Sequence, residues 1–155
     1  MAAESMVILL AEDDEGHALL VKRNLARAGI ANEIVHVTDG QKALDFVRRE
    51  GRHAHRSAGM NLLLVLDINM PCLDGVQVLQ QIKADESTAK IPVIMLTTTD
   101  DPREVERCYE IGCSVYITKP VEYVGFVEAI RQLGLFLQVV QVPHESAGRG
   151  DTWRP

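Results

Sequence analysis

Polar residues follow four short apolar runs of this sequence, and their types could hold a cation and take part in group transfer. Glu12 and Asp13 come after one run, Asp67 after another, and Thr97 and Lys119 after two more. Parallel strands end at a common edge of a sheet, and ligands bind outside those ends. If the runs are such strands, three carboxylates, a hydroxyl and an ammonium converge on one site.

Carboxylates gathered in this way need a compensating charge. Two carboxylates about 4 Å apart repel each other by roughly 4 kcal/mol at an effective dielectric constant of about 20. Three ionised carboxylates therefore require protons or a metal ion. An oxygen-only ligand set favours a hard ion such as Mg²⁺ or Ca²⁺, and a few carboxylates with room for water and phosphate suit Mg²⁺ better. We therefore expect Mg²⁺ as the cofactor.

The apolar runs predict the strands that position these residues. Runs 6–11 (MVILLA), 62–66 (LLLVL) and 92–96 (PVIML) lack the alternation of a strand with one solvated face. Unbroken runs are typical of strands covered on both sides in a parallel sheet. Segments 33–37 and 114–117 are weaker strands bounded by Gly, Asn, Asp or Pro. Five strands are therefore predicted.

Between these runs, apolar residues recur at helical spacing, and glycines stand where helices commonly end. Gly29, Gly51 and Gly112 are predicted to end the first, second and fourth helices. Alternation of strand and helix requires right-handed crossovers and gives a parallel sheet with helices on both faces. The predicted fold class is α/β, a doubly wound (βα)5 flavodoxin-like fold with a five-stranded parallel sheet. The run 136–143 predicts one more extended piece.

The composition indicates one acidic domain. The chain has 155 residues and a formal net charge of −6 at pH 7. This charge disfavours nucleic acid as a partner, because binding to phosphates rests on Lys and Arg. No apolar stretch approaches the roughly 20 residues that cross a bilayer, and the start of the chain lacks the basic region of a signal peptide. With three unclustered cysteines, we expect a cytoplasmic protein without a membrane partner.

Several short motifs at the predicted strand ends resemble the receiver domains of two-component response regulators, over about residues 6–137. They are Glu12-Asp13, Asp67-Ile68-Asn69-Met70-Pro71, Asp74-Gly75, Thr97 and Lys119-Pro120. Each motif alone is common, but all of them in order at the proper strand ends are specific. The resemblance implies a sensor histidine kinase as partner. It also implies a phosphoacceptor protein that assists its own phosphorylation and dephosphorylation, not an enzyme.

The resemblance also assigns roles to the residues at the strand ends. Asp67 is the expected phosphoacceptor, and its carboxylate would attack the phosphorus of a phosphohistidine in line. Mg²⁺ would be bound by Asp67, by Asp13 directly, by Glu12 mainly through water, and by the backbone carbonyl of Asn69. Mg²⁺ and Lys119 would neutralise the equatorial phosphoryl oxygens of a loose transition state.

Two further residues resemble the switch pair of this family. Thr97 resembles the catalytic hydroxyl that turns toward the new phosphoryl group, and Tyr116 resembles the aromatic side chain that follows it. The face expected to change comprises the fourth helix, fifth strand and fifth helix, roughly 102–137. Thr98 and Thr99 depart from the smaller or more variable residues usual there. Their bulk or polarity would screen attacking water and so affect the phosphoryl lifetime.

The predicted organisation has a disordered start at 1–5, a receiver domain at 6–137, and a carboxyl-terminal extension and tail at 138–155. Loop 48–59 and the ending 129–143 resemble the small stand-alone receivers paired with bacterial phytochrome histidine kinases. In those relatives the extension exchanges between protomers, and its apolar residues here would be costly to leave in water. We therefore expect a homodimer through the carboxyl-terminal segment.

Alternative functions stay open at this stage. An aspartate-nucleophile phosphatase also uses a strand-end Asp, but its general acid lies two residues on, where this sequence has Asn69. A phosphorylation-independent interaction module with the receiver fold would be expected to lack some of the acids or the lysine, and all are present. His53 and His55 could suggest a metal site, but they lack a third ligand.

Overall fold

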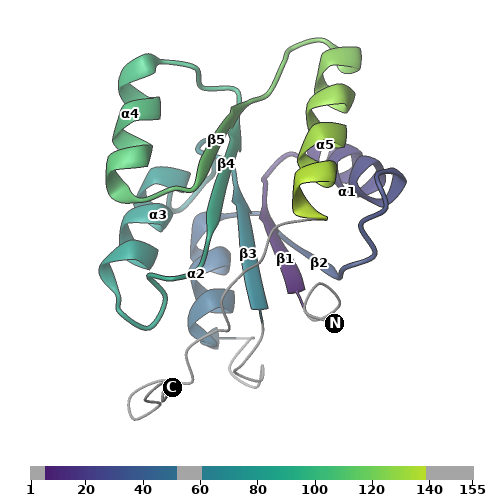
Figure 1. Cartoon of the computed structure of the whole chain (residues 1–155). Helices are drawn as coiled ribbons and strands as arrows, with labels where there is room; N and C mark the ends of the chain where they lie inside the picture. Colours follow the sequence, from purple (N-terminus) through teal and green to yellow (C-terminus); the bar gives the residue numbers. More distant parts are fainter. Residues whose placement is uncertain (1–5, 52–60, 139–155) are drawn as a thin grey trace, which may run out of the picture.

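The computed structural model of the protein describes residues 6–51 and 61–138, in which five strands alternate with five helices (Figure 1). The strands are β1 (Met6–Ala11), β2 (Ile34–Val37), β3 (Asn61–Leu66), β4 (Val93–Thr97) and β5 (Val115–Thr118). The helices are α1 (Glu15–Arg27), α2 (Gly40–Arg48), α3 (Gly75–Ala84), α4 (Pro102–Ile111) and α5 (Tyr123–Leu137). The sheet order is β2-β1-β3-β4-β5, and these pairings are parallel. The predicted doubly wound fold is confirmed.

Helices cover both faces of the sheet. α1 and α5 lie side by side on one face, and α2, α3 and α4 lie on the other (Figure 1). Strands β1, β3 and β4 are therefore covered on both sides, and every residue in them is buried. This burial is what the unbroken apolar runs predicted. Within the described part of the chain, no helix is both long and apolar enough to span a membrane.

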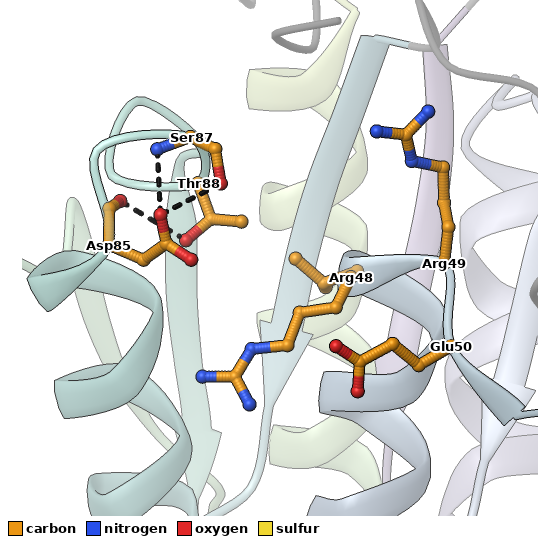
Figure 2. Close-up of a pocket in the computed structure, with 7 residues that line it drawn as sticks. Arg48, Arg49, Glu50, Asp85, Ser87 and Thr88 are labelled. Carbon is orange, nitrogen blue, oxygen red and sulfur yellow. Dashed lines mark hydrogen bonds between the residues drawn. The ribbon is translucent and has the colours of Figure 1, made fainter. Parts of the chain in front are cut away.

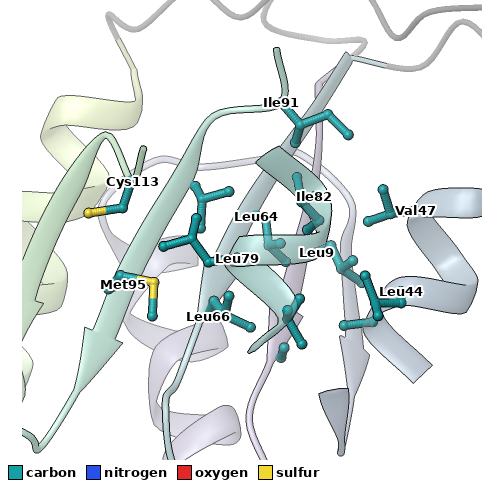
Figure 3. Packing of buried hydrophobic residues seen from close by; sticks show 14 of the residues in the cluster. Leu9, Leu44, Val47, Leu64, Leu66, Leu79, Ile82, Ile91, Met95 and Cys113 are labelled. Atoms are coloured by element: carbon teal, nitrogen blue, oxygen red, sulfur yellow. The ribbon is translucent and has the colours of Figure 1, made fainter. Parts of the chain in front are cut away.

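Two apolar clusters hold the layers together. In the cluster beneath α2, α3 and α4, Leu9, Leu64 and Met95 of the strands pack with Leu44 and Leu79 of the helices (Figure 3). The second cluster joins the opposite face of the sheet to α1 and α5. Complete burial of one such side chain stabilises a fold by about 1.5–3 kcal/mol. The two clusters therefore hold the strand ends in fixed relative positions.

Aspartates fix where helices begin. Asp14, Asp39, Asp74 and Asp101 each accept a hydrogen bond from a backbone N–H in the first turn of the helix that follows. The N–H of Asp74 also bonds to the Gln77 side chain, which completes a capping box. Each such cap contributes about 1 kcal/mol. α1 and α3 thus start at defined residues beside the carboxyl ends of β1 and β3.

The second helix ends differently from the sequence-based expectation. It does not end at Gly51, because Arg49 already adopts the left-handed conformation, with φ of 58°. The N–H groups of Arg49 and Glu50 bond to the carbonyls of Phe46 and Asp45. These hydrogen bonds satisfy the last turn and offset the cost of a non-glycine residue in that conformation.

The other corrections concern the ends of elements. β2 begins at Ile34 instead of residue 33, and β3, β4 and β5 are displaced from the predicted ranges by one residue at one or both ends. Phe136 and Leu137 do not begin an extended piece but end α5. Leu137 is one of the residues that α5 buries, and this burial favours continuing the helix to that position. Apart from residues 48–51 and Gln138, the predicted disordered start, loop and carboxyl-terminal extension lie outside the described residues.

A polar hollow lies away from the carboxyl ends of the strands (Figure 2). It is lined by the end of α2, including Arg48, and by the turn after α3, including Asp85. The Asp85 carboxylate accepts hydrogen bonds from the N–H and the hydroxyl of Ser87, so it is engaged within its own turn. Helices end at the opposite edge of the sheet from the strands that precede them. The hollow is therefore remote from the predicted site.

A close crossing joins α1 to α5. A Cβ added at Gly134 would come within 2.5 Å of the Cβ of Ala28. The side chain of Gln138 donates a hydrogen bond to the Ala28 carbonyl at the same crossing. The missing side chain at position 134 therefore sets how closely the two helices approach.

We predict that Gly134→Ala destabilises the protein by about 1–3 kcal/mol, despite the better helix propensity of alanine, because the added methyl group collides with Ala28. Ala28→Gly makes room for that methyl group, so the double variant should recover most of the loss. Urea unfolding followed by circular dichroism gives the free energies of unfolding. Additive losses in the double variant would contradict the predicted collision.

Candidate functional site

The carboxyl ends of β1 and β3 bring three acidic side chains together. Glu12 and Asp13 follow β1, and Asp67 follows β3, its neighbour in the sheet. One carboxylate oxygen from each residue lies within 4.8 Å of the others. Glu12 and Asp67 are 2% and 7% exposed, whereas Asp13 faces solvent. The acids predicted to share a site are thus adjacent at one edge of the sheet.

Lys119 places its ammonium between two of these acids. Its N–H bonds to the Thr97 carbonyl at 2.7 Å, which continues the pairing of β4 and β5 past the end of the strand. Its Nζ donates hydrogen bonds to Asp67 Oδ2 at 3.0 Å and to Glu12 Oε1. Lys119 is buried, and a buried ammonium is tolerated only with such partners. The lysine is therefore held within the acidic cluster.

Gly75 allows α3 to begin next to Asp67. The N–H of Asp67 bonds to the Ala11 carbonyl at 3.1 Å, and the N–H of Gly75 bonds back to the Ile68 carbonyl at 2.8 Å. A Cβ at position 75 would collide with the Asp67 carbonyl and the Ile68 backbone. Only glycine permits this approach, so Gly75 helps to fix the backbone that carries Asp67.

The two buried carboxyl groups carry charge unequally. Burial raises the pKa of Glu12 to about 7, and the Asp67 carboxylate adds to the rise, whereas Lys119 opposes it. Burial also acts to raise the pKa of Asp67, but hydrogen bonds from Thr97 and Glu12, with the Lys119 charge, outweigh it and hold that pKa below its usual range. Asp67 is therefore the ionised member, and Glu12 keeps its proton to a higher pH than an ordinary carboxyl group does.

The last residue of β4 and a residue that follows β3 both contact the Asp67 carboxylate. Thr97 is fully buried, and its hydroxyl hydrogen-bonds to Asp67 and accepts the N–H of Thr99 at 3.5 Å. Asn69 is exposed, and its N–H donates to Asp67 Oδ1 at 3.4 Å. Its side-chain amide donates to the Thr99 hydroxyl at 3.4 Å. Thr98 in the loop after β4 is exposed.

Tyr116 connects β5 to the same loop and to α4. It is half-buried, and its hydroxyl donates to the Thr99 carbonyl at 2.5 Å. Burial, with nearby acidic groups, raises the pKa of Tyr116 to about 12, so the hydroxyl keeps its proton as a donor. The hydroxyl of Tyr109 in α4 accepts the N–H of Tyr116 at 3.0 Å. Tyr116 therefore contacts the loop that follows Thr97.

His17 lies beside the site, although the sequence did not single it out. It stands in the first turn of α1, where Asp14 accepts its N–H at 3.0 Å. Its Nδ1 lies 3.4 Å from Lys119 Nζ and 3.6 Å from Glu12 Oε1. Side chains in a helix point toward its amino terminus, so a helix capped at Asp14 turns this residue back toward the strand end. That cap was the signal in the sequence that could have indicated His17.

The donor set fits a divalent cation. Glu12, Asp13 and Asp67 supply closely spaced carboxylate oxygens, which are the donors that hard ions prefer. Ionised, these three carboxylates carry three negative charges, against the one positive charge of Lys119. A divalent cation held by these three residues would complete the balance.

The fold and this site belong to a known family. The family model described as the response regulator receiver domain matches residues 8–131. The chain is therefore a member of the response regulator receiver family, whose members are phosphoacceptor signalling proteins that interact with histidine kinases. The family resemblance drawn from the sequence is confirmed.

Individual relatives include response regulators of phytochromes. A receiver domain from Rhodospirillum rubrum is 48% identical, with a TM-score of 0.84 over 91% of this chain and 99% of that one. Rcp1 from Synechocystis sp. is 33% identical over 88% of this chain and 92% of its own length, and its Mn²⁺-bound structure has a TM-score of 0.82. The bacteriophytochrome response regulator RtBRR is 40% identical, with a TM-score of 0.69 over 83% of this chain and 77% of that one.

The raised pKa of Glu12 predicts how the stability of the metal-free protein depends on pH. A carboxyl group whose pKa rises on folding stabilises the fold below its unfolded value of 4.5 and loses that contribution as the pH rises through about 7. We predict a fall in the free energy of unfolding on the order of 2 kcal/mol between about pH 5 and about pH 8. Glu12→Gln should remove most of this fall.

Urea unfolding in the presence of a chelator measures this dependence. Glu15→Gln, at an exposed position in the first turn of α1, is the matched control and should keep the wild-type dependence. Added Mg²⁺ should stabilise the wild type more at the higher pH, where no proton has to leave Glu12 first. A Glu12→Gln protein with the wild-type dependence on pH would contradict the prediction.

Proposed function

We propose that this chain accepts a phosphoryl group on Asp67 from a partner histidine kinase and signals through a conformational change at α4, β5 and α5. The observation that carries the proposal is the state of the Asp67 carboxylate. Its pKa is held below the usual range, and one of its oxygens is bonded to Lys119 at 3.0 Å. An ionised and oriented carboxylate is suited to act as a nucleophile toward a phosphoryl group.

In the proposed transfer, an oxygen of Asp67 attacks the phosphorus of a phosphohistidine on the kinase. A new oxygen–phosphorus bond forms, the nitrogen–phosphorus bond breaks, and the imidazole leaves with the bonding electron pair and takes up a proton. Lys119 orients Asp67 and faces the charge that develops on the phosphoryl oxygens. Thr97 supplies a hydroxyl beside the same carboxylate.

We further propose Mg²⁺ as the resident cation. The carboxylates of Glu12, Asp13 and Asp67 and the backbone carbonyl of Asn69 would hold it, and when bound it supplies positive charge beside the phosphoryl oxygens. The exposure of Asp13 leaves room for the water ligands that Mg²⁺ keeps. The Mn²⁺-bound form of the similar protein Rcp1 supports a divalent cation in this group of proteins.

The contacts around the loop after β4 support the proposed signalling face. A Thr97 hydroxyl drawn toward a phosphoryl group would pull on Thr99, whose carbonyl accepts the hydrogen bond of Tyr116. Helix α4 follows this loop and buries only Cys108 among its ten residues, so its displacement disrupts little packing. Thr97 and Tyr116 are therefore the proposed switch residues, and 102–137 is the proposed face.

Phosphorylation by a small donor tests the proposed chemistry. We predict that the wild type gains one phosphoryl group in its intact mass from acetyl phosphate or phosphoramidate, and only with Mg²⁺. Asp67→Asn should gain none, because its amide is a poor nucleophile. Asp39→Asn is the matched control, since asparagine caps α2 equally well, and it should be phosphorylated like the wild type. Changes in amide chemical shifts should concentrate in residues 102–137.

Each part of the proposal has an outcome that contradicts it. A folded wild type that gains no phosphoryl group from either donor with Mg²⁺ would favour the phosphorylation-independent interaction module instead. Equal phosphorylation of Asp67→Asn would mean that another residue is the acceptor. Shift changes confined to the acidic cluster would contradict signalling through α4, β5 and α5.

We propose a bacterial phytochrome histidine kinase as the partner and a homodimer through the carboxyl-terminal segment 138–155. The similarity to the bacteriophytochrome response regulator RtBRR supports this kinase class. An apolar groove between β5 and α5, lined in part by Val115 and Ile117, supports a protein contact near the end of α5. Leu135 and Phe136 near the end of α5 are 48% and 44% exposed, and such surface favours association.

Size-exclusion chromatography with light scattering tests the homodimer. We predict twice the monomer mass for the full chain and the monomer mass for a chain that ends at Gln138, because the shorter chain lacks the apolar segment. Circular dichroism controls for folding of the shorter chain. A monomeric full chain, or a dimer that persists without the segment, would contradict the proposed contact.

A further inference from the structure

His17 contacts both the acidic site and α5, and none of the proposed steps uses it. Its side chain is 41% exposed, and an edge of its ring faces Lys119 and Glu12. The face of the ring stacks on Phe126, with the ring centroids 5.7 Å apart and the planes inclined by 29°. The acidic site and Phe126 lie on different elements, so the contacts of His17 connect the site to α5.

The Nδ1 atom of His17 completes the surroundings of the Lys119 ammonium. An ammonium has three N–H donors and no acceptor. Glu12 Oε1 and Asp67 Oδ2 accept two of them, and His17 Nδ1 lies 3.4 Å from the same nitrogen. A favourable contact there uses the lone pair of Nδ1, with the ring proton on Nε2. The ammonium is then held from three directions, which fixes the position of its charge.

Phe126 anchors the other side of the histidine ring. It is buried in the first turns of α5 and belongs to the apolar cluster beneath α1 and α5. Stacked rings favour a defined offset, so a displaced His17 ring disturbs its contact with Phe126.

Once Asp67 carries a phosphoryl group, negative charge lies farther out from the strand end, and the Lys119 ammonium is drawn toward it.

We propose that His17 is a positioning residue of the phosphotransfer site, which holds the Lys119 ammonium and passes its displacement to α5 through Phe126. This proposal rests on the proposed function, because it describes how a change at the same site would be transmitted to the layer formed by α1 and α5. This route is separate from that of Tyr116, which packs on the other face of the sheet.

Two substitutions separate the two contacts of His17. His17→Asn keeps a side-chain oxygen that can accept a hydrogen bond from Lys119 but removes the ring from Phe126. His17→Phe keeps a ring for Phe126 but removes the acceptor. Arg23→Gln, at an exposed position of α1, is the matched control. Thermal unfolding establishes that each variant is folded.

We expect His17→Phe to slow phosphorylation by acetyl phosphate at saturating Mg²⁺ by roughly three- to tenfold, as for loss of one hydrogen bond, with His17→Asn and Arg23→Gln within about twofold of the wild type. In protein with isotope-labelled lysine, the Nζ resonance of Lys119 should shift in His17→Phe and not in Arg23→Gln. The amide shifts that phosphorylation causes in α5 should shrink in His17→Asn, while those in α4 remain.

The outcomes distinguish this proposal from the proposed function. A wild-type rate and an unchanged Lys119 resonance in His17→Phe would overturn the positioning role. Undiminished α5 shifts in His17→Asn would overturn the coupling to Phe126. If the wild type gains no phosphoryl group, the proposed function fails, and the Lys119 resonance still decides whether His17 holds the ammonium, because that measurement needs no phosphorylation.

Discussion

A lysine ammonium buried between two carboxyl groups is the interaction on which the functional edge of this protein depends. Lys119 is 3% exposed, and an unpaired charge at that depth would cost several kcal/mol. Glu12 and Asp67 offset this cost, but together with Asp13 they carry more negative charge than one ammonium balances. The cluster is therefore complete only with a proton or a cation. The strand ends, and the close approach of α3 that Gly75 allows beside Asp67, keep these groups near one another. The folded protein therefore always needs a proton or a cation at this site.

The helices around this site differ in how firmly they are packed. On one face, α5 lies so close to α1 that Gly134 leaves no room for a methyl group. On the other face, α4 buries only Cys108 and contacts β5 through the hydrogen bond between Tyr109 and Tyr116. A change of charge at Asp67 thus meets a closely packed pair of helices, α1 and α5, on one side and a more easily displaced helix, α4, on the other. This asymmetry favours a directed response over a general loosening of the fold.

Much of the fold and the acidic cluster could be predicted from the sequence, because both leave strong local patterns. The apolar runs of β1, β3 and β4 indicate strands buried on both faces, and the polar residues after them meet because parallel strands end at one edge. Helix ends were less predictable: Arg49 takes the left-handed conformation expected of glycine, since the hydrogen bonds of the last turn decide it. The Asp14 cap could direct His17 toward the strand ends, but its contacts with Lys119 and Phe126 depend on distances across the fold, which the cap alone does not give.

Within the part of the chain that the structure describes, β5 is the last strand of the sheet, so one side of its backbone faces outward. An open strand edge is a template on which a strand of another molecule can pair, and this is a route to aggregation. The outward N–H of Tyr116, which such a strand would use, already donates its hydrogen bond to the Tyr109 hydroxyl. The position of α4 therefore matters for the edge of the sheet as well as for the proposed signalling face. It also determines whether another strand can pair with β5. A large displacement of α4 therefore carries a risk of self-association.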